Sequence, residues 1–129
     1  MARWHTVSRR KPTGGLLLKH VKRKNKDKGS EFLETRIAER KTKAKRMKGG
    51  GQKDKILAAD FVNVSDSSSK SQKKAKIISV ESNPANVHYV RRNVITKGAV
   101  VKTELGSVRI TSRPGQTGSL SGVLLKEQK

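Results

Sequence analysis

The chain has 129 residues, and its 31 Lys and Arg against 10 Asp and Glu give a formal net charge of +21. Apolar residues make up 32% of it, against about 45–50% in ordinary globular domains, so the sequence predicts one small domain beside a segment that cannot fold alone. Cysteine is absent, which excludes disulfides and thiolate metal sites, and no apolar run exceeds four residues, so we expect an intracellular protein without a membrane span or signal peptide.

Residues 1–30 form a basic N-terminal segment with neither helical nor strand periodicity. The segment holds ten basic residues and one acid, Asp27. Pro12 and the pair Gly14-Gly15 interrupt any regular element that could begin there. We predict that this extended arm is disordered without RNA and becomes ordered on a polyanion, while residues 31–129 form the folded domain.

Residues 31–48 fit two interpretations. Their Glu, Ala, Arg and Lys content favours a helix, and the apolar positions partly follow a 3.6-residue period. Residues 34–37 and 42–46 can equally be interpreted as short strands. The pattern leaves this choice open, and Gly49-Gly50-Gly51 ends whichever element precedes it.

From residue 56 onward the apolar residues recur nearer every second position. Leu57, Ala59 and Phe61 share one face of a predicted strand, and Val64 falls off that face, which indicates a bulge near residues 62–63. A polar stretch, residues 65–72, is expected to form a mobile hairpin loop that leads into a second strand over 75–80.

The string Asn83-Pro84-Ala85-Asn86 is the strongest local turn signal. Asn83 is predicted to cap a short helix whose first residue is Pro84, because proline lacks the N–H that would be unpaired there. The later glycines, Gly98 and Gly106, are expected to form turns with positive φ.

Four further strands are expected in the C-terminal part, at residues 94–96, 100–103, 108–111 and 120–125. Short strands joined by glycine turns are typical of barrels and sandwiches. The sequence therefore predicts an all-β fold: a small closed or nearly closed barrel of about six strands with one short helix, preceded by the long basic arm.

Catalytic chemistry finds little support. His5, His20 and His88 are scattered, and ten acids among 31 bases are expected to be charged and paired. The glycines at 49–51 lack the spacing of a phosphate-binding loop. We therefore expect no enzyme, no metal, no cofactor and no small-molecule substrate.

A net charge of +21 calls for a polyanionic partner, and nucleic acid is the obvious one, because each neutralised phosphate releases a counterion. A membrane surface is the weaker alternative, since no basic amphipathic helix of useful length is present. Trp4 has two equal interpretations, base stacking and packing on the domain, and Arg109 could pair with Glu104 as an outward strand residue. The candidate RNA-binding residues are Arg3, Trp4, Arg9, Arg10, Lys11, Lys19, Lys22, Arg23, Lys24, Lys26, Lys28, Arg46, Lys48, Arg91, Arg92, Lys97 and Arg113.

Several strings resemble one family of small-subunit ribosomal proteins, the family numbered eight in archaea and eukaryotes. They are Arg9-Arg10-Lys11-Pro12-Thr13-Gly14-Gly15, Asn83-Pro84-Ala85-Asn86, Tyr89-Val90-Arg91-Arg92-Asn93, Thr96-Lys97-Gly98-Ala99, Thr103-Glu104-Leu105-Gly106 and Thr111-Ser112-Arg113-Pro114-Gly115-Gln116. They occur in the family's order and span nearly the whole chain. Residues 16–18 and 38–51 depart from its pattern, and the large insertion of eukaryotic members is absent, so the chain resembles the archaeal form.

The resemblance implies a structural constituent of the small ribosomal subunit in the cytoplasm. Its implied partners are small-subunit rRNA and neighbouring ribosomal proteins. The resemblance also implies a small β-barrel, which favours strands for residues 31–48. Three alternatives remain: a ribosome-assembly factor of the same superfamily; a DNA-compacting protein, which would explain the charge but not the strings; and, as a distant third, an enzyme acting on RNA, for which the sequence offers no acid–base site.

Overall fold

Strands dominate the part of the chain that the structure describes. The computed structural model describes residues 8–18, 22 and 24–125, and the chain divides into two units, Met1–Phe32 and Leu33–Lys129. None of the helices within the described residues is long and apolar enough to cross a membrane. The strands are β1 (Thr35–Arg36), β2 (Lys41–Arg46), β3 (Gln52–Ala58), β4 (Phe61–Asp66), β5 (Ser71–Ser82), β6 (Val94–Ile95), β7 (Val100–Thr103), β8 (Gly106–Ile110) and β9 (Ser121–Leu124). The helices are α1 (His88–Arg91) and the 3₁₀ turns η1 (Asn25–Asp27) and η2 (Lys48–Gly50).

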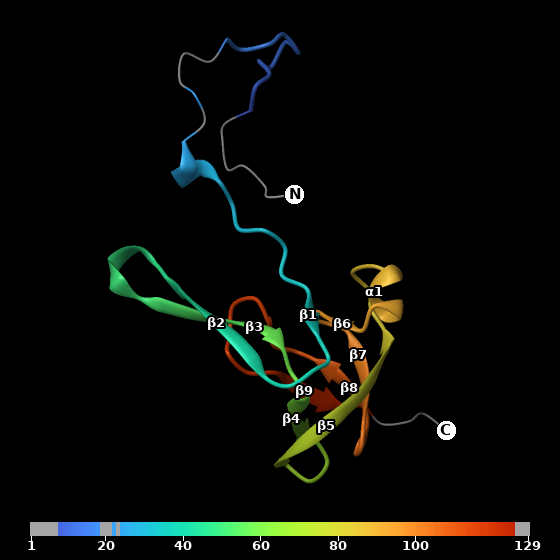
Figure 1. The fold of residues 1–129 in the computed structure, drawn as a ribbon. Coiled ribbons are helices and arrows are strands. Elements are labelled where there is room, and N and C mark those ends of the chain that lie inside the picture. Colours follow the sequence, from blue (N-terminus) through green and yellow to red (C-terminus); the bar gives the residue numbers. More distant parts are fainter. Residues whose placement is uncertain (1–7, 19–21, 23, 126–129) are drawn as a thin grey trace. The chain divides into compact units, whose positions relative to one another are not determined.

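Five strands of the second unit close into a barrel in the order β4-β5-β7-β8-β9 (Figure 1). Neighbouring strands are antiparallel except at the closing seam, where β4 and β9 run parallel. Closure leaves the barrel without an unpaired edge strand. The predicted all-β barrel with one short helix is thus confirmed, with five strands in the barrel itself.

The remaining strands form a second sheet in the order β2-β3-β1-β6. Residues 31–48 therefore contain strands, as the family resemblance implied, and not the helix that composition alone allowed. Thr35 anchors this sheet: its side chain is fully buried, and its hydroxyl donates to the carbonyl oxygen of Ile56 at 2.7 Å. β2 and β3 extend away from the barrel, past β1, as a two-stranded ribbon (Figure 1).

One hydrophobic core serves both sheets. Ile56 of β3 and Ile95 of β6 are 2% and 1% exposed and belong to the same cluster as the barrel residues. Small β-branched side chains suit the interior of a narrow barrel. The buried apolar residues are Ile56, Ala59, Val62, Val64, Ala75, Ile77, Val80, Val94, Ile95, Ala99, Val101, Val108, Ile110 and Leu120.

The single strand face predicted for Leu57, Ala59 and Phe61 is not found. Ala59 is buried, but Phe61 is 40% exposed and Leu57 is half-buried, and the buried residues of β4 are Val62 and Val64. β4 pairs with β5 in regular register throughout, so the predicted bulge near residues 62–63 is absent from this described pairing. The irregularity lies earlier, at residues 59–60, where the chain leaves the second sheet and enters the barrel.

The turn after β5 also differs from its prediction. Asn83 is buried, its amide donates to the carbonyl of Val94, and its Oδ1 accepts from the Ala85 N–H and the Thr96 hydroxyl at 3.0 and 2.9 Å. It therefore shapes an Asx turn and does not cap a helix. The helix begins at His88, whose N–H donates a hydrogen bond to Asn86 Oδ1 at 2.9 Å.

The structure tests the predictions made for two glycine turns and for the polar loop at residues 65–72. Gly98 and Gly106 have φ of +86° and +122°, which confirms their positive-φ turns. The polar loop between β4 and β5 is shorter than predicted, because Asp66 ends one strand and Ser71 begins the next. The Asp66 carboxylate accepts from the Ser68 N–H and the Ser69 hydroxyl, and these bonds lower the pKa of Asp66.

The first unit carries a compact turn of its own. The carbonyl of Lys11 accepts from the Gly14 N–H at 2.9 Å, with proline at the second turn position, and Leu17 N–H donates to the Arg9 carbonyl at 2.8 Å. This is the order of residues that a β-turn favours. Disorder of the arm without RNA stays a prediction.

Candidate nucleic-acid interface

The predicted RNA-binding residues are exposed wherever the structure describes their side chains. Arg3, Trp4, Lys19 and Arg23 lie outside the described residues, and Lys48 is described by its backbone alone, in η2. The exposed ones are Arg9, Arg10, Lys11, Lys22, Lys24, Lys26, Lys28, Arg46, Arg91, Arg92, Lys97 and Arg113. They fall into three regions: the arm, the outer end of the β2–β3 ribbon, and the surface around α1 and the later turns.

In the arm, the turn places three consecutive cations on a short scaffold. Arg9, Arg10 and Lys11 lead into it, and Arg10 Nη1 donates back to the carbonyl of Gly14 at 2.7 Å. Part of the hydrogen-bonding capacity of Arg10 is therefore used to hold the turn. Arg9 and Lys11 retain exposed side chains for an external anion.

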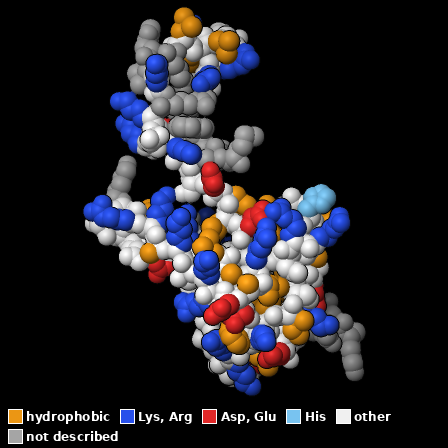
Figure 2. Space-filling view, in the orientation of Figure 1, with side chains coloured by type: hydrophobic (Ala, Val, Ile, Leu, Met, Phe, Trp, Pro, Cys, Tyr) orange, Lys and Arg blue, Asp and Glu red, His pale blue; other side chains and the backbone are white. Residues whose placement is uncertain are grey.

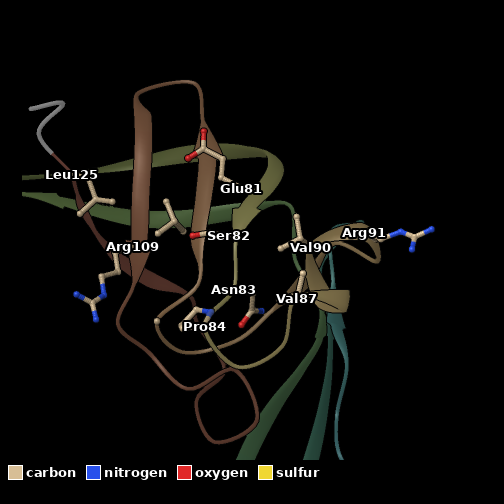
Figure 3. A pocket seen from close by; sticks show the side chains of 11 residues that line it. Glu81, Ser82, Asn83, Pro84, Val87, Val90, Arg91, Arg109 and Leu125 are labelled. Carbon is tan, nitrogen blue, oxygen red and sulfur yellow. The ribbon is translucent and has the colours of Figure 1, made fainter. Parts of the chain in front are cut away.

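Around α1, a carboxylate orients one of two adjacent arginines. Arg92 Nη2 lies 2.5 Å from both oxygens of Glu34, and Arg36 Nη2 lies 3.1 Å from Glu34 Oε2. The hydrogen bond from Arg36 and the charge of Arg92 lower the pKa of Glu34 despite some desolvation. Glu34, which directly precedes β1, thus fixes the side chain of Arg92. The side chain of Arg91 instead extends from α1 into open space (Figure 3).

An apolar groove separates Arg91 from Arg109. It encloses about 720 Å³, and among its lining residues Val87 and Val90 of the α1 region face it from one side and Leu125 from the other (Figure 3). The two arginines extend away from it in different directions. Arg109 forms no ion pair with Glu104 within the described part of the chain, so the pairing considered for it is not found.

The later turns present further cations. Lys97 precedes Gly98 in the turn before β7, and Arg113 opens the turn that leads to Gln116. The Arg113 carbonyl accepts from the N–H groups of Gln116 and Thr117 at 2.9 and 3.1 Å, which fixes the backbone beneath its exposed side chain.

The β2–β3 ribbon carries basic residues that the sequence prediction missed. Lys43 lies opposite Lys55, and Lys45 lies opposite Lys53. Directly opposed residues share one face of a sheet. We call these four residues the lysine ladder. Alternate lysines on both sides of the glycine turn were the signal in the sequence, but that signal requires residues 41–55 to be strands, which the pattern left open.

Positive charge is prominent at two places on the surface of the second unit. Figure 2 shows Lys and Arg side chains over the β2–β3 ribbon and around α1. Among the described residues no three His, Cys, Asp or Glu side chains are grouped to hold a metal ion. What these exposed cations can do chemically is bind an extended anion at several points.

Comparison with known proteins agrees with this surface. Residues 4–125 match the family described as Ribosomal protein S8e. The chain is 44% identical over 128 residues to the small ribosomal subunit protein eS8 of Methanococcus aeolicus, covering 98% of this chain and all of the relative. It is 42% identical over the same length to the protein of that name in Methanococcus maripaludis strain C7, again covering 98% of the chain and 100% of the relative.

Proposed function

The chain belongs to the ribosomal protein S8e family, and from that premise we propose that it is a structural constituent of the small ribosomal subunit that binds and stabilises rRNA. The observation that carries this function is the similarity over 98% of the chain to proteins named for the small ribosomal subunit. Its place is then the cytoplasmic ribosome, and its role is structural and not catalytic.

The mechanism is neutralisation of phosphates by two kinds of cation. A net charge of +21 repels itself in the isolated chain and gains from every counterion that rRNA releases. The barrel offers cations on fixed turns, such as Arg92 held by Glu34, and these set the register on RNA. The arm offers ten basic residues on a segment whose sequence has no helical or strand periodicity, which suits the space between packed helices.

The proposed contact residues are those predicted from the sequence, joined by the lysine ladder. Exposure of every described candidate supports them. Neighbouring ribosomal proteins are further proposed partners, and the apolar groove beside α1 is a surface of the kind that protein contacts use.

Sedimentation of a cell lysate through a sucrose gradient in high salt tests the function. We expect the protein to travel with the small subunit in growing cells, including in mature subunits within polysomes. Travel with chromatin would support DNA compaction instead, and travel only with immature precursor particles would support an assembly factor. Either outcome would overturn the proposal.

A further inference from the structure

The lysine ladder places four like charges on a small area of one ribbon face. Opposed side chains on neighbouring strands have Cβ atoms about 4.5–5.5 Å apart, and same-face residues along one strand are about 7 Å apart. Lys43 and Lys45 therefore form one column on β2, and Lys53 and Lys55 form a parallel column on β3. In each column the two lysines are two residues apart along the strand, and the two columns lie side by side.

This arrangement works against the stability of the ribbon. Like charges directly opposite each other are destabilising in a sheet; all six residues of β2 and Lys53 of β3 are exposed, and Lys55 is half-buried. Lys53 Nζ donates to Gln116 Oε1 at 2.9 Å, which is a neutral partner. Asp54, the acid of β3, lies on the other face of the ribbon opposite Ala44 and accepts from Gln52 at 3.1 Å. Two opposed pairs of lysines on one face concentrate positive charge that an external anion can bind.

The chemistry of the ladder indicates which anion. Between residues 41 and 58 there is no Phe, Tyr or Trp, so the ribbon has no platform on which a single-stranded base could stack. The ladder face itself carries lysines, which are flexible point charges suited to phosphate and not to reading base edges. The ladder is therefore equipped to bind a backbone without regard to sequence.

Two columns of cations side by side fit two phosphate backbones side by side. The A-form RNA helix brings its backbones together across a deep, narrow major groove that side chains cannot read. We propose that the lysine ladder lies across the mouth of this groove in an rRNA double helix, with the β2 column against one strand and the β3 column against the other. The inference rests on the proposed function, because it assumes that the physiological polyanion is rRNA.

The test compares two sets of four charges in the full-length protein. The ladder variant carries Lys43→Gln, Lys45→Gln, Lys53→Gln and Lys55→Gln. The matched control carries Lys70→Gln, Lys73→Gln, Lys76→Gln and Lys102→Gln, whose side chains are exposed and lie on β5, β7 and the turn before β5. Binding to a 20-base-pair RNA duplex of arbitrary sequence, to its single strand and to the DNA duplex of that sequence is measured by fluorescence anisotropy at several salt concentrations.

On the RNA duplex, we expect the ladder variant to flatten the slope of log affinity against log salt by about 3 to 4 units, since each duplex phosphate contact contributes about 0.9. The control should flatten it by about 1 unit or less. On the single strand and on the DNA duplex, whose major groove is far wider, the ladder variant should lose less than half as much. Equal losses on all three nucleic acids, or equal losses by the two variants on duplex RNA, would overturn the proposal.

Further measurements distinguish a loss of RNA contacts from a loss of folding and from a failure of the proposed function. The ladder variant removes a repulsion, so its melting temperature should equal or exceed that of the natural protein, and a variant with arginine at the same four positions should keep the slope within about 1 unit. Unchanged duplex binding by the ladder variant, in a protein that still travels with the small subunit, would overturn the ladder and leave the proposed function standing. Failure of the natural protein to travel with the subunit would instead overturn the proposed function.

Discussion

Gly122 shows at the scale of one residue how closely the strands approach where the barrel closes. It pairs with Val64 of β4 on one side and Ile110 of β8 on the other. A Cβ at this position would lie 2.5 Å from Val108 Cγ1 and 2.9 Å from the carbonyl oxygen of Arg109. Only glycine therefore allows both pairings at this seam.

Gly122→Ala should consequently destabilise the fold by about 1–3 kcal/mol, because the backbone of β8 cannot yield without breaking its pairing. Gly115→Ala is the matched control: a Cβ there meets nothing within 4 Å, so the change should stay within about 0.5 kcal/mol. Thermal unfolding by circular dichroism measures both. Similar melting temperatures for the two variants would contradict the close approach.

Glu34 predicts a pH dependence at the same scale. The hydrogen bond from Arg36 and the charge of Arg92 hold its pKa below the ordinary value of 4.5. A carboxylate with a lowered folded-state pKa stabilises the fold above its unfolded pKa and loses that contribution as the pH falls through the folded value. Glu34→Gln should therefore lower the melting temperature at pH 6, and the melting temperatures of the two proteins should converge as the pH falls below 4.5 and through the lowered folded-state pKa of Glu34. A constant difference across this range would show that the ion pairs contribute nothing.

At the scale of an element, Asn83 joins the end of β5 to β6 and to the turn between them. Its amide and carbonyl oxygen satisfy groups of Val94, Ala85 and Thr96. Asn83→Ala would leave these partners unpaired in a buried place, which costs about 1–3 kcal/mol for each such loss. Asn63→Ala, at an exposed position of β4, is the control and should be near neutral. Equal denaturation midpoints in urea would refute a structural role for Asn83.

The elements differ in how far sequence reveals them. β7 and β8 follow directly from glycine turns and from short runs rich in β-branched residues, because in these strands local pattern and tertiary pairing agree. β3 and β4 depart from the prediction because the chain changes sheets at residues 59–60. The period-two pattern shows the change of face at Val64, but it does not distinguish a bulge within one strand from a crossing between sheets. The N-cap predicted at Asn83 is wrong because the side chain of Asn83 is buried. Burial brings it against Val94 and Thr96, and capping preferences, which depend only on neighbouring residues, do not include such partners.

The candidate interface divides in the same way. The basic strings of the arm and Arg91-Arg92 stand out by composition alone. The lysine ladder depends on which residues of two strands face each other, and register is set by the turn at residues 48–51 and by the long-range anchor at Thr35. The partnership of Arg92 with Glu34, 58 positions apart, likewise emerges only from the fold.

At the scale of the whole molecule, the two units should contribute differently to RNA binding. Deleting residues 2–28 removes ten basic residues and one acid. If about half of these cations meet phosphates, the deletion should flatten the slope of log affinity against log salt by roughly 3 to 5 units. Competition binding to cognate rRNA at several salt concentrations measures this change, and a slope unaltered by the deletion would remove the arm from the interface.

The domain arginines should instead govern discrimination between cognate rRNA and bulk RNA. Arg91→Ala with Arg92→Ala removes two charges, so its slope change should be at most about 2 units. Arg92 is held by Glu34 on a folded surface and loses less side-chain freedom on docking than an arm lysine does, so it positions the protein on its RNA. The double variant should therefore reduce the preference for cognate rRNA over total-RNA competitor more, per charge removed, than the arm deletion does. Arg92→Lys, checked for an unchanged melting temperature, separates lost positioning from lost stability, because lysine keeps the charge but not the planar guanidinium whose Nη2 contacts both oxygens of Glu34. If the arm deletion abolishes the preference while the double variant retains it, positioning belongs to the arm.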